Sequence, residues 1–167
     1  PNMGRTGKAR IINTSSVTCK MGEVGDHFFK LDPEHYRRFK AYPNSKLAIL
    51  MFTTELARRL QGRAITVNAV DPGVVNTGMI TMHKWYDPLA DIFFRPFIKS
   101  PERGAMTAIL LATSDQYVNI SGGFFRNKHQ VGLPEAALDV EACQNLWLQT
   151  EQFVAGLVGS RLKKGEN

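Results

Sequence analysis

The stretch YPNSKLAILMFTTELARRLQGRAITVNAVD, residues 42–71, decides the fold because it joins a helix to a buried strand. Small and apolar side chains recur at helical spacing and predict a helix over residues 43–61, which begins near Tyr42. Gly62 follows the last turn, where a C-cap belongs. Residues 65–70 (ITVNAV) are a short apolar run that is typical of a buried strand.

A second strand is predicted upstream of this helix. Residues 10–16 (RIINTSS) form a short buried run that ends in two serine hydroxyls. The two strands and the helix between them make a strand–helix–strand unit, in which the strands run parallel. Open α/β sheets of this kind bind their ligands at the carboxyl ends of the strands. We therefore expect a site where these strands end, near Ser16 and beyond Asp71.

Tyr42 and Lys46 form a candidate acid/base pair. They are four residues apart and so lie one helical turn apart on the same face. A free phenol releases its proton poorly at neutral pH, and a nearby cation favours the phenolate. Such a pair can pass a proton to or from an alcohol or a carbonyl group. The spacing alone is common, because a half-exposed tyrosine and a surface lysine give the same pattern.

Further sequence motifs lie on both sides of this pair. They are IINTSS (11–16), SKLAILMFTTELARRL (45–60), VDPGVVNT (70–77), SPERGAMTAILLA (100–112) and SGGFF (121–125). Together with Tyr42, Ser45 and Lys46, they resemble the motifs of the short-chain dehydrogenase/reductase family. Within that family, the retinol-dehydrogenase-like group matches best. The resemblance covers most of residues 9–126.

The resemblance implies an α/β fold, a partial Rossmann-type doubly wound parallel sheet. Residues 9–14, 64–70 and 123–126 would be its last three strands, side by side, with helices on both faces. Only 15 residues precede Ser16, too few for the family's glycine-rich phosphate-binding turn. We therefore expect residues 1–167 to be a single, truncated C-terminal half of such a domain. The strand at 9–14 would then have an open edge, and the isolated chain would be inactive.

The family's catalytic roles map onto three residues of this chain. Tyr42 would act as the general acid in reduction and as the general base in oxidation. Lys46 would favour the phenolate and reach the ribose hydroxyls of the nicotinamide cofactor. Ser16, rather than Ser15, would hydrogen-bond the substrate oxygen.

The resemblance also implies a cofactor, NAD or NADP, at the motif that follows residue 71. Pro72 and Gly73 would form the turn beneath the nicotinamide. Val75 would offer backbone groups to the carboxamide, and Thr77 a hydroxyl near the carboxamide or a phosphate. A proline–glycine turn after a strand also occurs without any ligand.

The segment 79–98 is rich in large apolar side chains and is predicted to cover an apolar substrate. This composition favours a small lipophilic alcohol or carbonyl compound, such as a retinoid, a steroid or another lipid. Core packing and contact with a membrane are the alternative interpretations. Further along, residues 101–113 and 134–158 are predicted helices.

Composition restricts the partners and the compartment. The net charge of +6 comes from scattered basic residues, so we expect no nucleic-acid partner. Cys19 and Cys143 lie far apart without a CxxC motif, which predicts no metal site and no disulfide. We expect a cytoplasmic protein or one on the cytosolic face of an intracellular membrane. Membrane association would require a preceding N-terminal segment or residues 79–98, and homo-oligomerisation remains open.

The predicted function is an oxidoreductase that uses NAD or NADP and interconverts an alcohol with its carbonyl compound through Ser16, Tyr42 and Lys46. The alternative is a catalytically inactive truncated product that acts as an association or regulatory module, using the open edge of the strand at 9–14.

Overall fold

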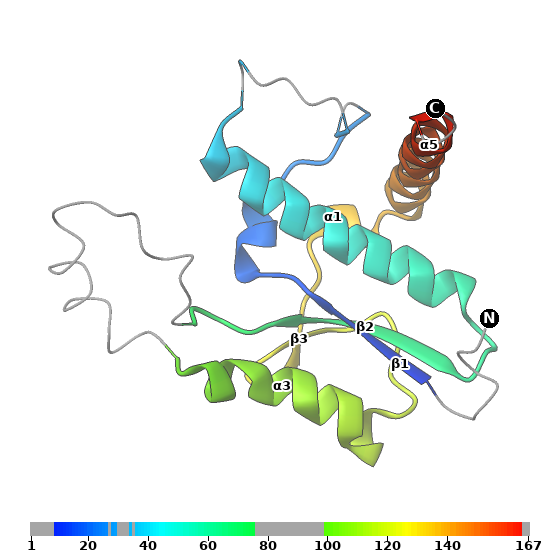
Figure 1. Cartoon of the computed structure of the whole chain (residues 1–167). Coiled ribbons are helices and arrows are strands. Elements are labelled where there is room, and N and C mark those ends of the chain that lie inside the picture. Colours follow the sequence, from blue (N-terminus) through cyan, green and yellow to red (C-terminus); the bar gives the residue numbers. More distant parts are fainter. Residues whose placement is uncertain (1–8, 27, 30–33, 35, 76–98, 165–167) are drawn as a thin grey trace, which may run out of the picture.

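The sheet is the centre of the structure. The computed structural model describes residues 9–26, 28–29, 34, 36–75 and 99–164, without the side chains of Arg38 and residues 160–164. Within them, β1 (Ala9–Thr14), β2 (Ile65–Asp71), β3 (Phe124–Arg126) and β4 (His129–Val131) form one sheet in the order β1-β2-β3-β4 (Figure 1). β1, β2 and β3 are parallel, and β4 pairs antiparallel with β3. The predicted α/β class and the contiguous strands are confirmed, while β4 was not predicted.

Two helices cover opposite faces of this sheet. α1 (Arg38–Arg59) lies on one face and α3 (Pro101–Thr113) on the other (Figure 1). α3 begins where predicted, because Ser100 caps it by accepting a hydrogen bond from the Arg103 N–H at 3.4 Å. Pro101 occupies the first turn, where a missing N–H costs nothing. Within the described residues, β1 is an edge strand of the sheet, as expected.

The start of α1 differs from the predicted start at residue 43. The helix begins at Arg38, so Pro43 lies inside it and Tyr42 is in its second turn. Pro43 removes one donor from the helix, to the carbonyl four residues earlier at Phe39. Arg37 precedes the helix without a capping side-chain bond, so the sequence has no start signal there. The C-cap is Leu60, and Gly62 follows with φ +79°.

The predicted helix over residues 134–158 is two helices. α4 (Glu135–Leu138) ends at Asp139, whose backbone is extended, and α5 (Val140–Lys164) follows. The Asp139 carboxylate accepts a hydrogen bond from the Ala142 N–H at 3.1 Å and so caps the new helix. α5 packs against α1. A prediction of one continuous helix was therefore wrong at residue 139.

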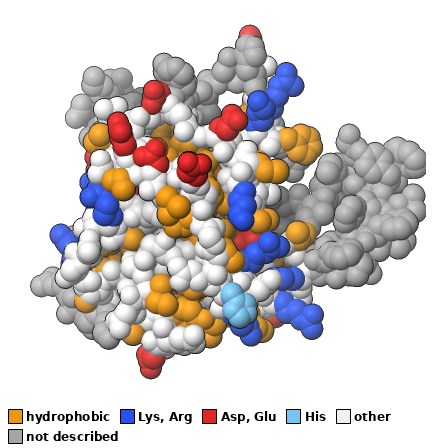
Figure 2. All heavy atoms as spheres, turned by 180° about the vertical axis from the view of Figure 1, so that it is seen from behind, with side chains coloured by type: hydrophobic (Ala, Val, Ile, Leu, Met, Phe, Trp, Pro, Cys, Tyr) orange, Lys and Arg blue, Asp and Glu red, His pale blue; other side chains and the backbone are white. Residues whose placement is uncertain are grey.

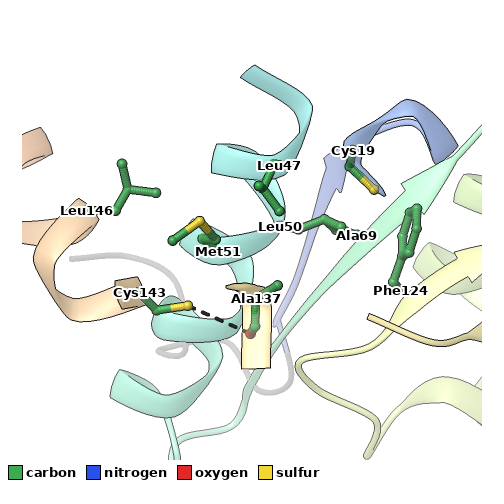
Figure 3. Close-up of a cluster of buried hydrophobic side chains, with 9 residues drawn as sticks. All are labelled: Cys19, Leu47, Leu50, Met51, Ala69, Phe124, Ala137, Cys143 and Leu146. Carbon is green, nitrogen blue, oxygen red and sulfur yellow. Dashed lines mark hydrogen bonds between the residues drawn. The ribbon is translucent and has the colours of Figure 1, made fainter. Parts of the chain in front are cut away.

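The core on the α1 face joins α1 to the 3₁₀ helix η1 (Val17–Met21), to the central strands β2 and β3 and to the C-terminal helices α4 and α5. Three α1 residues, Leu47, Leu50 and Met51, point toward the sheet and toward α5 (Figure 3). They pack with Cys19, Ala69, Phe124, Ala137, Cys143 and Leu146, all at most 3% exposed. Leu50 continues the helical row of Tyr42 and Lys46 by one more turn, so its burial turns this row toward the sheet.

Alternation along the central strands builds a second core on the other face. Ala69 and Phe124 face α1, whereas their neighbours Val70 and Phe125 pack with Leu111 of α3. This is the period of two that a strand buried on both faces requires. Cys19 and Cys143 are both buried free thiols.

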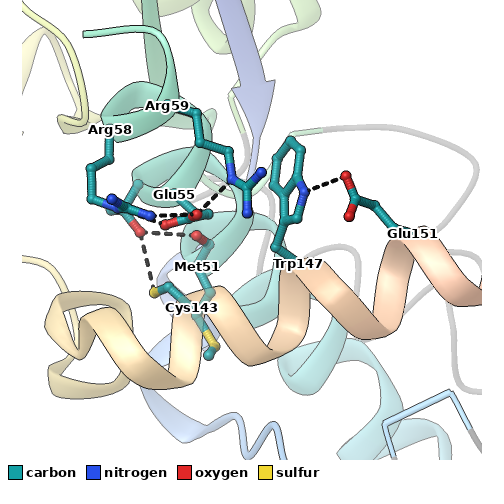
Figure 4. Close-up of polar contacts among 8 residues, drawn as sticks. Met51, Glu55, Arg58, Arg59, Cys143, Trp147 and Glu151 are labelled. Atoms are coloured by element: carbon teal, nitrogen blue, oxygen red, sulfur yellow. Dashed lines mark hydrogen bonds and ion pairs between the residues drawn. The ribbon is translucent and has the colours of Figure 1, made fainter.

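A buried carboxylate anchors the last turns of α1. The Glu55 side chain is 1% exposed and accepts hydrogen bonds from the Arg58 guanidinium at 2.8 and 2.9 Å and from Arg59 at 2.6 Å. Arg59 also lies over the Trp147 ring, 4.3 Å from its centroid, and Trp147 donates to Glu151 on α5 (Figure 4). Burial disfavours the charged carboxylate, but the two guanidinium groups outweigh it and hold the pKa of Glu55 below its ordinary value.

This pKa shift predicts a loss of stability in acid. Because the folded-state pKa of Glu55 is depressed, its contribution is fully present above its unfolded pKa of about 4.3. The contribution is lost as the pH falls through the folded pKa. We expect the free energy of unfolding to fall more steeply between about pH 5 and pH 3 in the wild type than in Glu55→Gln, as measured by urea titration. Parallel curves for the two proteins would contradict the assignment.

Candidate functional site

Tyr42 and Lys46 lie together on the surface of α1, as the spacing predicted. The Lys46 ammonium is 5.5 Å from the centroid of the Tyr42 ring. Tyr42 is 39% exposed, so its hydroxyl-bearing ring is open to a molecule from solvent. Lys46 is half-buried. A cation over the face of an aromatic ring within about 6 Å is attracted to it, which keeps the two side chains together.

Lys46 also links α1 to the carboxyl end of β1. Its ammonium donates a hydrogen bond to the carbonyl of Thr14, the last residue of the strand, at 3.3 Å. In return, the buried Ser15 hydroxyl donates to the backbone carbonyl of Lys46 at 2.8 Å. These two bonds fix the helical turn of Lys46 against the end of β1.

Ser16 has a different environment from Ser15. Ser15 is 1% exposed and its hydroxyl is used between β1 and α1. Ser16 is half-buried and is the N-cap of the 3₁₀ helix η1 (Val17–Met21), where its oxygen accepts from the Thr18 N–H at 3.3 Å. Because the Ser16 oxygen is the acceptor, this bond does not use the hydroxyl proton. The structure thus assigns Ser15 to the fold and leaves Ser16 with a proton to donate.

η1 packs closely on the half of α1 that carries Tyr42. At its end, a Cβ atom on Gly22 would lie 2.5 Å from the Pro43 carbonyl oxygen, so only glycine permits this approach. The Glu23 N–H then donates to the Asn44 side chain at 2.9 Å. The segment that follows Ser16 is therefore held against the first turns of α1.

The turn after β2 supplies the second half of the site. Gly73 has φ +77°, which favours glycine, and its N–H donates to the Asp71 carboxylate at 2.8 Å. Asp71 is 2% exposed, and its second oxygen lies 3.3 Å from Nε of Arg126 at the end of β3. The β2–β3 register places Asp71 beside Arg126. The end of β2 is thus fixed before the turn at Pro72 begins.

The two halves lie at the same edge of the sheet. Thr14 is paired with Val70 in the parallel β1–β2 register, and the Ser15 N–H donates to the Val70 carbonyl at 2.8 Å. Ser16 and Pro72 are consequently each two residues beyond this pair. Of the predicted cofactor residues, Pro72, Gly73 and Val75 are half-buried. Thr77 and the predicted substrate-covering segment 79–98 lie outside the described residues.

The buried thiol of Cys19 lies close to the end of β2 and is influenced by the charge of Asp71. Burial, and next the negative charge of Asp71, raise the pKa of the Cys19 thiol. A raised pKa keeps the sulfur protonated, which makes it a poor nucleophile. Cys19 is therefore not a candidate nucleophile at this edge.

The described residues contain no cluster of His, Cys, Asp and Glu arranged for a metal ion. None of their helices has the length and apolar character needed to span a bilayer. Figure 2 shows acidic as well as basic side chains on one face of the molecule, so this face is not an unbroken basic surface. A cavity of about 660 Å³ lies beside the start of β1 and β2, and its lining residues include none of the predicted site residues.

Comparison with known sequences supports the predicted family. The profile of the short chain dehydrogenase family matches residues 1–85. Human retinol dehydrogenase 14 is 36% identical over 150 residues, which covers 87% of this chain and 44% of the relative. Human retinol dehydrogenase 13 is 35% identical over 152 residues, 87% of this chain and 46% of the relative. The WW domain-containing oxidoreductase of Pongo abelii is 31% identical over 164 residues, 94% of this chain and 40% of that protein. The chain thus spans less than half the length of these relatives.

Solved structures agree with the fold. An uncharacterised protein from Mycobacterium paratuberculosis matches with a TM-score of 0.62 and 25% identity, over 87% of this chain and 50% of that one. The RhlG/NADP active-site complex of Pseudomonas aeruginosa matches with a TM-score of 0.53 and 26% identity. That match covers 75% of this chain and 47% of RhlG. The predicted family and fold class are confirmed by these similarities.

Proposed function

Because the chain belongs to the short-chain dehydrogenase family, we propose that it carries the proton-transfer half of an oxidoreductase that interconverts an alcohol with its aldehyde or ketone. The observation that carries this proposal is the position of Lys46. Its ammonium contacts the ring of Tyr42 and the carbonyl of Thr14 at the carboxyl end of β1. This places a cation beside an accessible phenol at the edge where α/β sheets bind ligands.

Tyr42 is the proposed general acid in reduction and general base in oxidation. Its exposure lets a substrate oxygen reach the hydroxyl, and a positioned proton donor of this kind contributes about 10²- to 10⁴-fold to a rate. Lys46 stabilises the phenolate that remains once the proton has left. Ser16 donates its hydroxyl proton to the same substrate oxygen and stabilises the charge that develops there.

The residues of this chain fit a nicotinamide cofactor, NAD or NADP. Gly73 lets the Lys99 side chain pack closely against the turn after β2, since a Cβ atom there would lie 3.0 Å from the Lys99 ammonium. In this proposal Pro72 and Gly73 lie beneath the nicotinamide, Val75 offers its backbone groups, and Lys46 holds the ribose hydroxyls. Thr77, outside the described residues, is proposed to add a hydroxyl. The bound cofactor would supply or accept the hydride, and the similarity to RhlG, solved with NADP, supports this choice.

The proposed substrate is a small lipophilic alcohol or its carbonyl compound. Two observations support this class: the relatives named retinol dehydrogenase and the apolar composition of residues 79–98. Such a substrate offers one polar oxygen, which Ser16 and Tyr42 suffice to bind. The rest of its surface requires apolar contacts.

Cofactor binding and turnover test the proposal. The protein for this test is the longest natural one that contains this sequence, with the 167-residue chain measured beside it. We expect the former to quench or shift the fluorescence of NADH or NADPH and to reduce all-trans-retinal at the expense of that cofactor. Absence of both binding and turnover with retinoid, steroid and aliphatic carbonyl compounds would overturn the proposal. Defined association of the 167-residue chain without cofactor binding would instead favour a role as an association module through the β1 edge.

A further inference from the structure

Lys99 contacts the turn after β2 with its side chain. Its ammonium donates to the Asn127 side-chain oxygen at 2.6 Å and to the Pro72 carbonyl at 3.4 Å. The atoms nearest to a Cβ atom added at Gly73 also belong to Lys99, with Nζ at 3.0 Å and Cε at 3.2 Å. The half-buried side chain therefore lies directly against the turn and fills the space that glycine leaves.

The backbone of Lys99 holds the same turn. Its N–H donates to the Val74 carbonyl at 2.8 Å, and Val75 and Lys99 form a parallel β-bridge. α3 starts immediately afterwards, and Gly104 in its first turns packs against Val75, where a Cβ atom would lie 2.5 Å from Cγ2. The backbone of Lys99 is therefore held in place, directly before the start of α3.

The acceptor on the other side is also fixed. Asn127 sits in the tight turn between β3 and β4 with φ 50°, a conformation that asparagine tolerates better than most residues. Its neighbour Arg126 is paired with Asp71 at 3.3 Å. The Lys99 ammonium thus spans from the β3–β4 turn to the β2 turn, and both of its acceptors are uncharged oxygens.

We propose that Lys99 is a positioning residue, which holds the Pro72–Val75 turn in the conformation that receives the nicotinamide end of the cofactor; this rests on the function proposed above. Lys99 restrains this turn in two ways. Its ammonium donates to the carbonyl of Pro72, and its backbone forms the bridge with Val75. Loss of the ammonium leaves the bridge but frees the Pro72 carbonyl and Gly73. A mispositioned turn weakens cofactor binding more than it affects proton transfer at Tyr42, which belongs to a different element.

The first test is amide hydrogen exchange, compared between the wild type and Lys99→Met in the longest natural protein that contains this sequence. Methionine keeps an unbranched side chain and removes the charge. We expect the amides of residues 73–75 to exchange about tenfold faster, since a bond to a charged donor is lost. Asn127→Gly suits the positive φ and removes only the acceptor, so it should accelerate the same amides less. Arg103→Met is the control, an exposed cation on α3 one turn away that should leave them unchanged.

The second test is steady-state kinetics with the same three variants. We expect Lys99→Met to raise the KM for NAD(P)H about tenfold with a smaller change in kcat, and direct cofactor titration to give a matching loss of affinity. Unchanged amide exchange at residues 73–75, or faster exchange with an unchanged KM, would overturn the inference. So would an equal effect of Arg103→Met. A wild-type protein without turnover would refute the proposed function, and the exchange data would still decide whether Lys99 holds the turn.

Discussion

Replacement of Tyr42 by phenylalanine is expected to lower turnover about 10³-fold. The phenylalanine ring can occupy the same place beside the Lys46 ammonium, so the packing of α1 is kept. Only the hydroxyl group is lost, and its proton has to reach or leave the substrate oxygen during the reaction. The affinity for the cofactor should change by less than about threefold, because Tyr42 acts on the substrate.

The measurement is kcat with the natural protein, alongside cofactor titration by fluorescence. Tyr36→Phe is the matched control, since Tyr36 is also an exposed tyrosine, at 65%, and lies shortly before α1. It should retain wild-type turnover. A Tyr42→Phe protein with near-normal kcat would remove Tyr42 from the proposed role, whatever its family resemblance.

Lys46→Met is expected to lower kcat/KM about 10²-fold and to weaken cofactor binding as well. The ammonium lies between the Tyr42 ring and the Thr14 carbonyl, so its loss removes a cation from both places. The phenolate form of Tyr42 then loses the positive charge of Lys46, and the ribose hydroxyls lose a donor. A combined effect on rate and cofactor affinity distinguishes this variant from Tyr42→Phe.

Kinetics and chemical unfolding together test this prediction. The bond to Thr14 also joins α1 to β1, so we expect a loss of about 1 kcal/mol in the free energy of unfolding. Lys20→Met is the control, because Lys20 is an exposed lysine in η1. If Lys46→Met lost only stability and kept kcat/KM, Lys46 would be a structural residue and not part of the site.

Periodicity in the sequence was sufficient for the elements with strong local signals. The strand predicted at 65–70 matches β2, which spans Ile65–Asp71, and the helix at 101–113 matches Pro101–Thr113. A serine N-cap followed by proline marks the start of the latter, and such signals are local. The start of α1 was missed because Arg37 gives no capping signal, and Pro43 favours a start at that residue.

The elements that were missed depend on less common local conformations. The turn between β3 and β4 places Asn127 and Lys128 at positive φ without any glycine, so its sequence carries only a weak hairpin signal. Asp139 is a residue type that often caps helices, but the apolar pattern continues on both sides of it and favours one helix. In both places a specific backbone conformation outweighs the periodic pattern of side chains.

The candidate site was predictable only where its residues are close in sequence. The spacing of Tyr42 and Lys46 made this pair predictable, and the composition of the turn at Pro72 made that turn predictable. Lys99 and Asn127 were missed because each is distant in sequence from the turn it supports: Lys99 lies 27 residues from Pro72, and the two side chains are separated by 28 residues. Their contacts arise from the β2–β3 register and the position of α3. Such contacts have no signature in a single sequence.

The pairing of Val75 with Lys99 has an evolutionary consequence. The bridge brings together the backbones of two residues that are distant in sequence, so it holds both ends of the interval between them at one point. The entropic cost of bringing the ends of such an interval together grows only with the logarithm of its length, about 0.6 kcal/mol for each doubling. Natural selection can therefore change the length of this interval at little cost in stability, because the Val75–Lys99 bridge fixes where its two ends lie.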